Sequence, residues 1–161
     1  MTARHPQRPT RVGVISDTHG MLRPEALVAL RGVDHIVHAG DIGAPEVLTT
    51  LQGIAPVTAV RGNNDRGPWA AAIPETNAVE VGGVWLYVLH DVQALDLDPE
   101  AAGFAAVIAG HSHRPLLERR AGVLFVNPGS AGPRRFTLPV AVARLRLRHG
   151  RLSGEVVELD V

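Results

Sequence analysis

Residues 12–20 decide the fold class, and their sequence is Val12-Gly13-Val14-Ile15-Ser16-Asp17-Thr18-His19-Gly20. The first four residues are apolar, and such a short run bounded by polar residues predicts a buried strand. A helix is expected next, over residues 24–30, because Pro24 suits a helix start and Gly32 suits a helix end. A buried strand followed by a helix is typical of a parallel βαβ unit.

The same alternation continues through the first half of the chain. A second strand is predicted over residues 35–39 and a third over residues 57–60. Between them, a helix is predicted over residues 45–52, with Gly53 as its stop signal. Strands and helices in this order favour a parallel sheet.

The second half is predicted to be mostly antiparallel. Residues 78–81 and 84–89 flank Gly82-Gly83, which is a strong hairpin signal. The remaining strands are expected over residues 105–109, 116–118, 123–126, 140–147 and 152–159. We therefore expect one α/β domain with mixed sheets over residues 11–161, preceded by a flexible tail at residues 1–10.

Composition excludes several classes of protein. The chain has 161 residues, and 16 Lys plus Arg balance 16 Asp plus Glu, so no general attraction to nucleic acid or to an anionic membrane is indicated. The chain has no cysteine, which excludes disulfides, thiolate zinc sites and a cysteine nucleophile. No apolar run approaches the ~18 residues of a membrane span, and the start lacks the apolar stretch of a signal peptide. We expect a cytoplasmic protein with no membrane partner.

Polar side chains gather directly after the predicted strands. The side chains in question are Asp17, His19, Asp41, Asn63, His90, His111 and His113. In open α/β sheets, ligands bind at the carboxyl ends of the strands, so these seven side chains are expected to converge on one edge.

The mixture of donors indicates a transition-metal site. Carboxylate oxygens, an amide oxygen and imidazole nitrogens suit Mn²⁺, Zn²⁺ or Fe better than Ca²⁺. Seven side chains are too many for one catalytic ion, but they fit two ions if one carboxylate bridges them. Any single histidine at a strand end is more often a structural residue than a ligand, so the prediction depends on the ordered set.

The ordered motifs resemble those of the calcineurin-like metallophosphoesterase superfamily. They are Asp17-Thr18-His19, Gly40-Asp41, Gly62-Asn63-Asn64-Asp65, His90 and Gly110-His111-Ser112-His113. Asn127-Pro128-Gly129-Ser130 and the short length resemble the small YfcE-like phosphodiesterase branch. The resemblance implies a four-layer αββα sandwich of two mixed β-sheets flanked by helices.

The resemblance also implies a set of ligands for two divalent transition-metal ions, with Mn favoured and Zn, Fe or Ni as alternatives. Asp17, His19 and His113 would hold the first ion. Asn63, His90 and His111 would hold the second ion, and Asp41 would bridge both.

Two positions depart from the family pattern. Asn64 stands where many relatives have a histidine that protonates the leaving group, and an amide cannot act as an acid. Asp91 follows His90, where glycine is usual. Asn64 could instead donate a hydrogen bond to the phosphate, and Asp65 could orient a neighbouring ligand.

These observations predict an enzyme that hydrolyses a small phosphate ester by attack of a metal-bridging hydroxide. A phosphodiester is favoured, with a phosphomonoester as the alternative. The rival hypotheses are a non-catalytic protein-binding scaffold on the same fold and a metal-dependent nuclease, although no nucleic-acid partner is indicated. Homo-oligomerisation is left open.

A separate group of charges lies near the end of the chain. Arg144, Arg146 and Arg148 alternate with leucines, so they line one face of the predicted strand at period two. A solvated face explains this pattern, and the alternative is a contact with a polyanion or another subunit.

Overall fold

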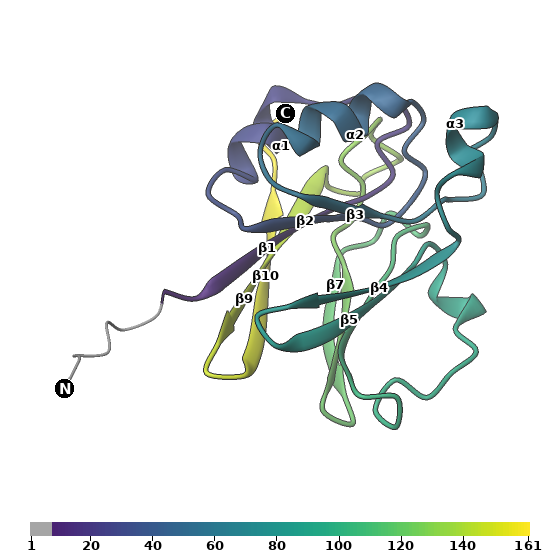
Figure 1. Ribbon diagram of the computed structural model, residues 1–161. Coiled ribbons are helices and arrows are strands. Elements are labelled where there is room, and N and C mark those ends of the chain that lie inside the picture. Colours follow the sequence, from purple (N-terminus) through teal and green to yellow (C-terminus); the bar gives the residue numbers. More distant parts are fainter. Residues whose placement is uncertain (1–7) are drawn as a thin grey trace.

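The structure is a computed structural model that describes residues 8–161, and the fold is two five-stranded sheets packed face to face (Figure 1). The first sheet has the strand order β10-β9-β1-β2-β3. Its members are β1 (Thr10–Ile15), β2 (His35–His38), β3 (Val57–Ala59), β9 (Ala141–Arg148) and β10 (Arg151–Glu158). Strands β1, β2 and β3 are parallel, whereas β9 and β10 are antiparallel to their neighbours.

The second sheet has the order β4-β5-β6-β8-β7. Its members are β4 (Thr76–Val81), β5 (Val84–Leu89), β6 (Phe104–Ile108), β7 (Leu116–Arg120) and β8 (Val123–Asn127). Strands β5, β6 and β8 are parallel, and β4 and β7 are antiparallel at the two edges. The prediction of two mixed sheets is confirmed.

Alternation along the strands sorts apolar side chains between the layers. Val12 and Val14 of β1 face the second sheet and pack with Leu86 and Ile108 in the core between the sheets. Ile15 faces outward into a second cluster under the helices. This cluster requires close approach, because a Cβ atom at Gly13 would lie 2.6 Å from Leu30 Cδ2.

The helices cover the outer face of the first sheet (Figure 1). They are α1 (Pro24–Ala29), α2 (Pro45–Gln52) and α3 (Pro68–Ala71). On the second sheet, the 3₁₀ helix η1 (Val92–Ala94) and the segment that follows it form the outer layer, where Leu95 and Leu97 pack on Tyr87 and Phe125. The fourth layer is therefore an irregular segment within the part of the chain that the structure describes.

The predicted boundaries agree with the structure to within a residue or two. Helix α2 matches its prediction, and β1 begins at Thr10 instead of Arg11. Helix α3 was not predicted, because four residues are too few to show a helical period. Residues 1–7 lie outside the described residues, so a flexible tail stays a prediction. No helix within residues 8–161 has the length and apolar character needed to cross a membrane.

Candidate metal centre

The predicted ligands lie in loops that hydrogen bonds tie together across both sheets. In the first sheet, Asp17 N donates to Gly40 O at 3.0 Å, which joins the loops after β1 and β2. In the second sheet, Gly110 N donates to His90 O at 2.9 Å. The two sheets are joined where His111 N donates to the Asp17 carboxylate at 3.1 Å. The carboxyl ends of strands from both sheets therefore meet at one site.

Five of the seven predicted ligands form two compact groups. Asp17, His19 and His113 form the first group, and Asp17, Asp41 and His90 form the second. Within each group the ligand atoms lie within 4.8 Å of one another.

The two carboxylates lie between the imidazoles. Asp41 Oδ2 is 3.8 Å from His19 Nε2 and 3.3 Å from His90 Nε2. Asp17 Oδ1 is 3.4 Å from His113 Nε2 and 3.9 Å from His90 Nε2. Each carboxylate thus contacts histidines from both groups.

The other two predicted ligands lie at the rim of the site. His111 Nδ1 is 3.3 Å from His90 Nε2, and the His111 side chain is 46% exposed. Asn63 is exposed and lines a cavity of about 390 Å³ together with His90 and His111. Neither Asn63 nor His111 belongs to the two compact groups.

The backbone at the site adopts strained left-handed conformations at most of the predicted ligands. Five predicted ligands have a positive φ angle: Asp17 (55°), His19 (48°), Asp41 (54°), His111 (70°) and His113 (61°). Such angles are uncommon outside glycine and cluster at functional sites, where the surrounding structure holds them. Strand direction alone does not place these side chains, because left-handed residues in the loops after the strands redirect the chain.

Neighbouring glycines leave room for the carboxylates. A Cβ atom at Gly62 would lie 2.2 Å from Asp41 Oδ1. A Cβ atom at Gly110 would lie 2.0 Å from Ser16 Oγ and 2.6 Å from Asp17 Oδ2. The glycine of each motif is therefore needed for the close approach of backbone and carboxylate.

Both carboxylates are held in the ionised form. Burial alone would raise the pKa of Asp17, but its contacts with His113 and Ser16 outweigh burial and lower the pKa below its usual value. Burial likewise acts to raise the pKa of Asp41, and contacts with His90 and Asn64 lower it strongly. Burial acts to lower the pKa of His90, but the Asp41 carboxylate and the Ala39 carbonyl raise it.

The donor set fits a divalent cation. Asp17 Oδ1 and His19 Nε2 are buried, and neither has a hydrogen-bond partner among the described residues. Buried polar atoms nearly always have a hydrogen-bond partner. Two unpaired polar atoms that face each other therefore fit a site for a cation. Ionised carboxylates and neutral imidazoles are the ligands that such an ion takes.

The hydrogen bonds of His90 favour the tautomer that can bind a metal ion through Nε2. His90 Nδ1 lies 2.7 Å from Ala39 O, a carbonyl oxygen that can only accept, so Nδ1 carries the proton and donates it. Nε2 is therefore the ring nitrogen that faces Asp41 and that would ligate an ion. Ligating histidines typically donate their other ring nitrogen to a carbonyl in this manner.

Asn64 and Asp65 contact the ligands or their loops. Asn64 donates to the Asp41 carboxylate from both its backbone N and its side-chain Nδ2, each at 2.9 Å. Asp65 is buried and accepts from the backbone of Ile42, Gly43 and Gly62 at 2.9–3.1 Å. Asn64 therefore contacts the predicted metal ligand Asp41, and Asp65 holds the loops that carry Asp41 and Asn63.

Thr18 and His38 form a buried hydrogen-bonded network next to the loops that carry the predicted ligands. Gly40 N donates to His38 Nδ1 at 3.1 Å, so His38 Nε2 carries the proton toward Thr18 Oγ1 at 3.0 Å. Thr18 in turn donates to Ile42 O at 2.8 Å. Burial lowers the pKa of His38 to about 4, which keeps the imidazole neutral. The His-x-Gly spacing of this network, His38-Ala39-Gly40, has no signal in the sequence alone.

Residues 10–150 match the calcineurin-like phosphoesterase superfamily domain. The chain belongs to this superfamily. It is 35% identical over 158 residues to a probable metallophosphoesterase of Methanothermobacter thermautotrophicus, and the match covers 91% of each chain.

Solved structures share the phosphoesterase fold. The Escherichia coli phosphoesterase YfcE is 21% identical, covers 94% of this chain and 100% of its own, and has a TM-score of 0.66. Vacuolar Protein Sorting 29 of Cryptosporidium parvum is 20% identical, covers 95% of this chain and 99% of its own, and has a TM-score of 0.73. The predicted resemblance is therefore confirmed at the level of the family and the fold.

Two cavities adjoin the candidate metal centre and share residues in their linings. One has a volume of about 490 Å³ and is lined by Val92, Val107, Leu116, Phe125 and Arg114, together with Asp91 and His111. The other has a volume of about 390 Å³ and is more polar, with Arg61, Asn63 and Glu75 in its lining. His111 and Asp91 line both cavities.

Proposed function

We propose that this chain is a binuclear metal-dependent phosphodiesterase. The observation that carries the proposal is the pair of ionised carboxylates, Asp17 and Asp41, that lie 3.3–4.0 Å from three imidazoles at the meeting point of two sheets. Superfamily membership supports phosphoesterase activity.

The proposed ligands follow the family motifs. Asp17, His19 and His113 hold the first ion, and Asn63, His90 and His111 hold the second. Asp41 bridges the two ions, a role supported by its position between His19 and His90. Mn²⁺ is the favoured metal, with Zn²⁺, Fe or Ni²⁺ as alternatives.

Such ions supply Lewis acidity, which polarises the phosphoryl oxygens and lowers the pKa of water. The chain supplies the rest. Asp65 fixes the loops after β2 and β3, and Asn64 orients the Asp41 carboxylate through two hydrogen bonds. Because Asn64 cannot protonate a leaving group, esters with good leaving groups are expected to react fastest.

The two cavities support a diester over a monoester. A phosphodiester carries two organic groups on one phosphorus atom, and a monoester carries one. Two cavities that share His111 and Asp91 offer a place for each group, and both have mixed polar and apolar linings. A small phosphodiester is therefore the proposed substrate class, and the cytoplasm is the proposed location of the enzyme.

The test is a matrix of metals and substrates combined with metal analysis. The full chain is loaded with Mn²⁺, Zn²⁺, Fe²⁺ or Ni²⁺ and assayed on an aryl phosphodiester, an aryl phosphomonoester, a cyclic nucleotide and an oligonucleotide. We expect about two ions per chain and the highest kcat/KM on the diester. Fewer than one ion per chain after loading would favour a protein-binding scaffold, and preference for the oligonucleotide would favour a nuclease.

A further inference from the structure

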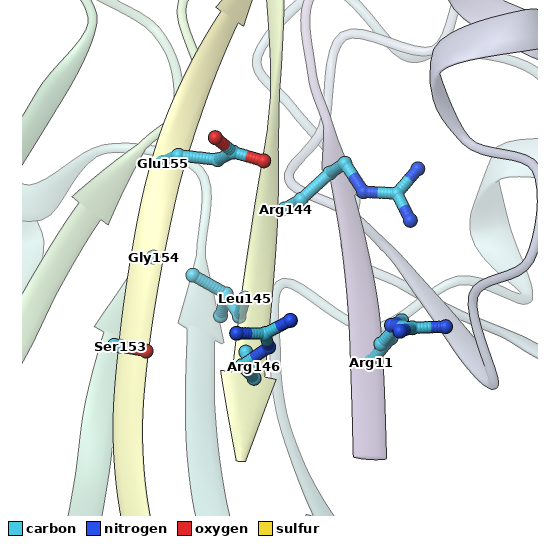
Figure 2. A pocket seen from close by; sticks show the side chains of 7 residues that line it. All are labelled: Arg11, Arg144, Leu145, Arg146, Ser153, Gly154 and Glu155. Carbon is cyan, nitrogen blue, oxygen red and sulfur yellow. The ribbon is translucent and has the colours of Figure 1, made fainter. Parts of the chain in front are cut away.

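A third cavity lies on the outer face of the first sheet, away from the metal centre. It has a volume of about 610 Å³ and is lined by Arg11, Arg144, Leu145, Arg146, Ser153, Gly154 and Glu155 (Figure 2). Arg11 lies near the start of β1, and Asp17 follows the end of β1. The six residues from Arg11 to Asp17 correspond to about 20 Å of extended chain. The pocket and the metal centre are therefore at opposite ends of β1.

The outer face of the first sheet changes character along its length. Near the metal centre, Ile15, Val142 and Val157 belong to the apolar cluster that the helices cover. At the other end, the same face carries arginines. They are Arg11 on β1, Arg144, Arg146 and Arg148 on β9, and Arg151 on β10.

Two pairs of these arginines lie directly opposite one another on neighbouring strands. Arg11 pairs with Arg146, and Arg148 pairs with Arg151. Directly opposed like charges in an antiparallel pair destabilise the sheet. The arrangement therefore destabilises the ligand-free sheet, and a bound anion would offset this repulsion.

The nearby carboxylates leave these charges largely uncompensated. Asp34 accepts from the Arg8 side chain and from the backbone N of Arg11. Within residues 8–161, the arginines that have a carboxylate within 4.0 Å are Arg8, Arg61 and Arg120. Glu155 lies across from Arg144 at the other end of the pocket from Arg11 and Arg146 (Figure 2).

One arginine of the pocket is already anchored. The Arg144 guanidinium donates to Ala29 O and, at 3.1 Å, to Arg31 O, which caps the carboxyl end of α1. This leaves the guanidinium groups of Arg11 and Arg146 as neighbouring forks of N–H donors, with the Ser153 hydroxyl on the strand beside Arg146. Arginine forks match the oxygens of phosphoryl groups, and two forks require more acceptor oxygens than one carboxylate has.

We propose that this pocket binds a small anion with two or more phosphoryl groups, held by Arg11 and Arg146 at a site separate from the metal centre. The proposal is independent of the phosphodiesterase activity, because none of the pocket residues belongs to the metal centre.

The probe is inorganic triphosphate, titrated into the metal-free full chain so that chelation of active-site metal cannot contribute. Calorimetry at low ionic strength should give saturable binding that weakens as salt is added. In ¹H–¹⁵N spectra of the same sample, the backbone amides of Arg11, Arg146 and Ser153 should shift. Shifts confined to Asp17, Asp41 and His111, or no saturation below about 10 mM, would overturn the proposal.

Single substitutions should change the affinity for triphosphate in opposite directions, which a solvated face without a binding site would not show. Arg146→Gln and Arg11→Gln should each weaken triphosphate binding about tenfold, and Glu155→Gln should strengthen it. Arg120→Gln, which removes one charge from the second sheet, is the matched control and should leave binding unchanged. Equal loss in Arg120→Gln would contradict a defined site.

Stability and nucleic-acid binding complete the test. Because Arg146→Gln removes one member of an opposed pair, it should raise the melting temperature of the ligand-free chain while it lowers affinity. A lower melting temperature would show that the arginine has a structural role and would overturn the proposal. Tighter binding of a duplex oligonucleotide than of triphosphate, with equal losses in Arg148→Gln and Arg151→Gln, would identify a nucleic-acid surface instead.

Discussion

The candidate metal centre has a buried half and an exposed half, and they differ in how completely the protein alone organises them. Asp17, Asp41 and His113 are at most 3% exposed and lie in two compact groups. His111 is half-exposed, and Asn63 is exposed at the rim. Under the proposed assignment, the first ion would enter a preorganised site, whereas the second ion would have to draw its rim ligands inward.

The largest effect is expected for the carboxylate between the two halves. Asp41→Ala should remove both ions and reduce kcat by about 10³-fold or more, because Asp41 is the proposed bridge. Metal analysis and steady-state kinetics on an aryl phosphodiester measure both effects, and Asp41→Asn tests the charge in an isosteric side chain.

Asp160→Ala is the matched control, because Asp160 is exposed and far along the chain from the motifs. It should keep two ions and full activity. Retention of both ions by a folded Asp41→Ala protein would refute the bridging role.

A change at the exposed half should be less severe. His111→Asn should lower kcat by about 10- to 100-fold and reduce the metal content to about one ion per chain, since the buried group is left intact. Titration with Mn²⁺ should show one tight site and one weakened site. Loss of both ions together would mean that the two halves form one cooperative unit.

A smaller effect is expected for Asn64, which donates two hydrogen bonds to Asp41. Asn64→Ala removes the bond from Nδ2 to Asp41 and keeps the bond from the backbone N, so kcat should fall by about tenfold with both ions retained. Asn77→Ala is a suitable control, because the Asn77 side chain accepts only from the neighbouring backbone N of Ala78. A change in metal content in Asn64→Ala would assign Asn64 to metal affinity instead.

The smallest effect on turnover, but a clear one on stability, is expected from the network beneath the buried half. Burial lowers the pKa of His38 from its ordinary value of 6.5 to about 4. Between pH 6.5 and pH 4, the unfolded chain therefore binds more protons than the folded chain. His38 therefore contributes stability that is present above pH 6.5 and is lost as the pH falls toward 4, by up to about 3 kcal/mol.

His90 has a raised pKa and acts in the opposite sense, so the His38 contribution must be isolated by difference. Urea unfolding of the metal-free chain should show that His38→Gln has a smaller loss of stability on acidification than the unsubstituted chain. Identical pH dependence of the two proteins would contradict a neutral, buried His38.

Sequence reasoning succeeded where structure is local and failed where it depends on contacts between distant loops. The apolar runs that became β1, β2, β5 and β6 were recognised from their patterning, and this placed the polar residues at strand ends. The left-handed conformations of Asp17 and His19 could not be predicted, because they are imposed by contacts with the loop after β2.

Burial of individual ligands was also beyond the sequence. His111 and His113 are two residues apart and have the same side chain, yet His113 is 4% exposed and His111 is 46% exposed at the side chain. Which of them faces inward depends on how the loop after β6 meets Asp17 in the other sheet. On the arginine face, period two placed Arg144 and Arg146 on one side of the strand, but the position of Arg146 opposite Arg11 depends on the register of β9 on β1.

The most direct test of the central claim is anomalous diffraction from crystals of the Mn²⁺-loaded protein, recorded at the manganese edge. The account predicts two peaks that flank Asp41, one in contact with Asp17, His19 and His113 and the other with His90. A single peak elsewhere, or no peak at these side chains in a protein that contains Mn²⁺, would contradict it.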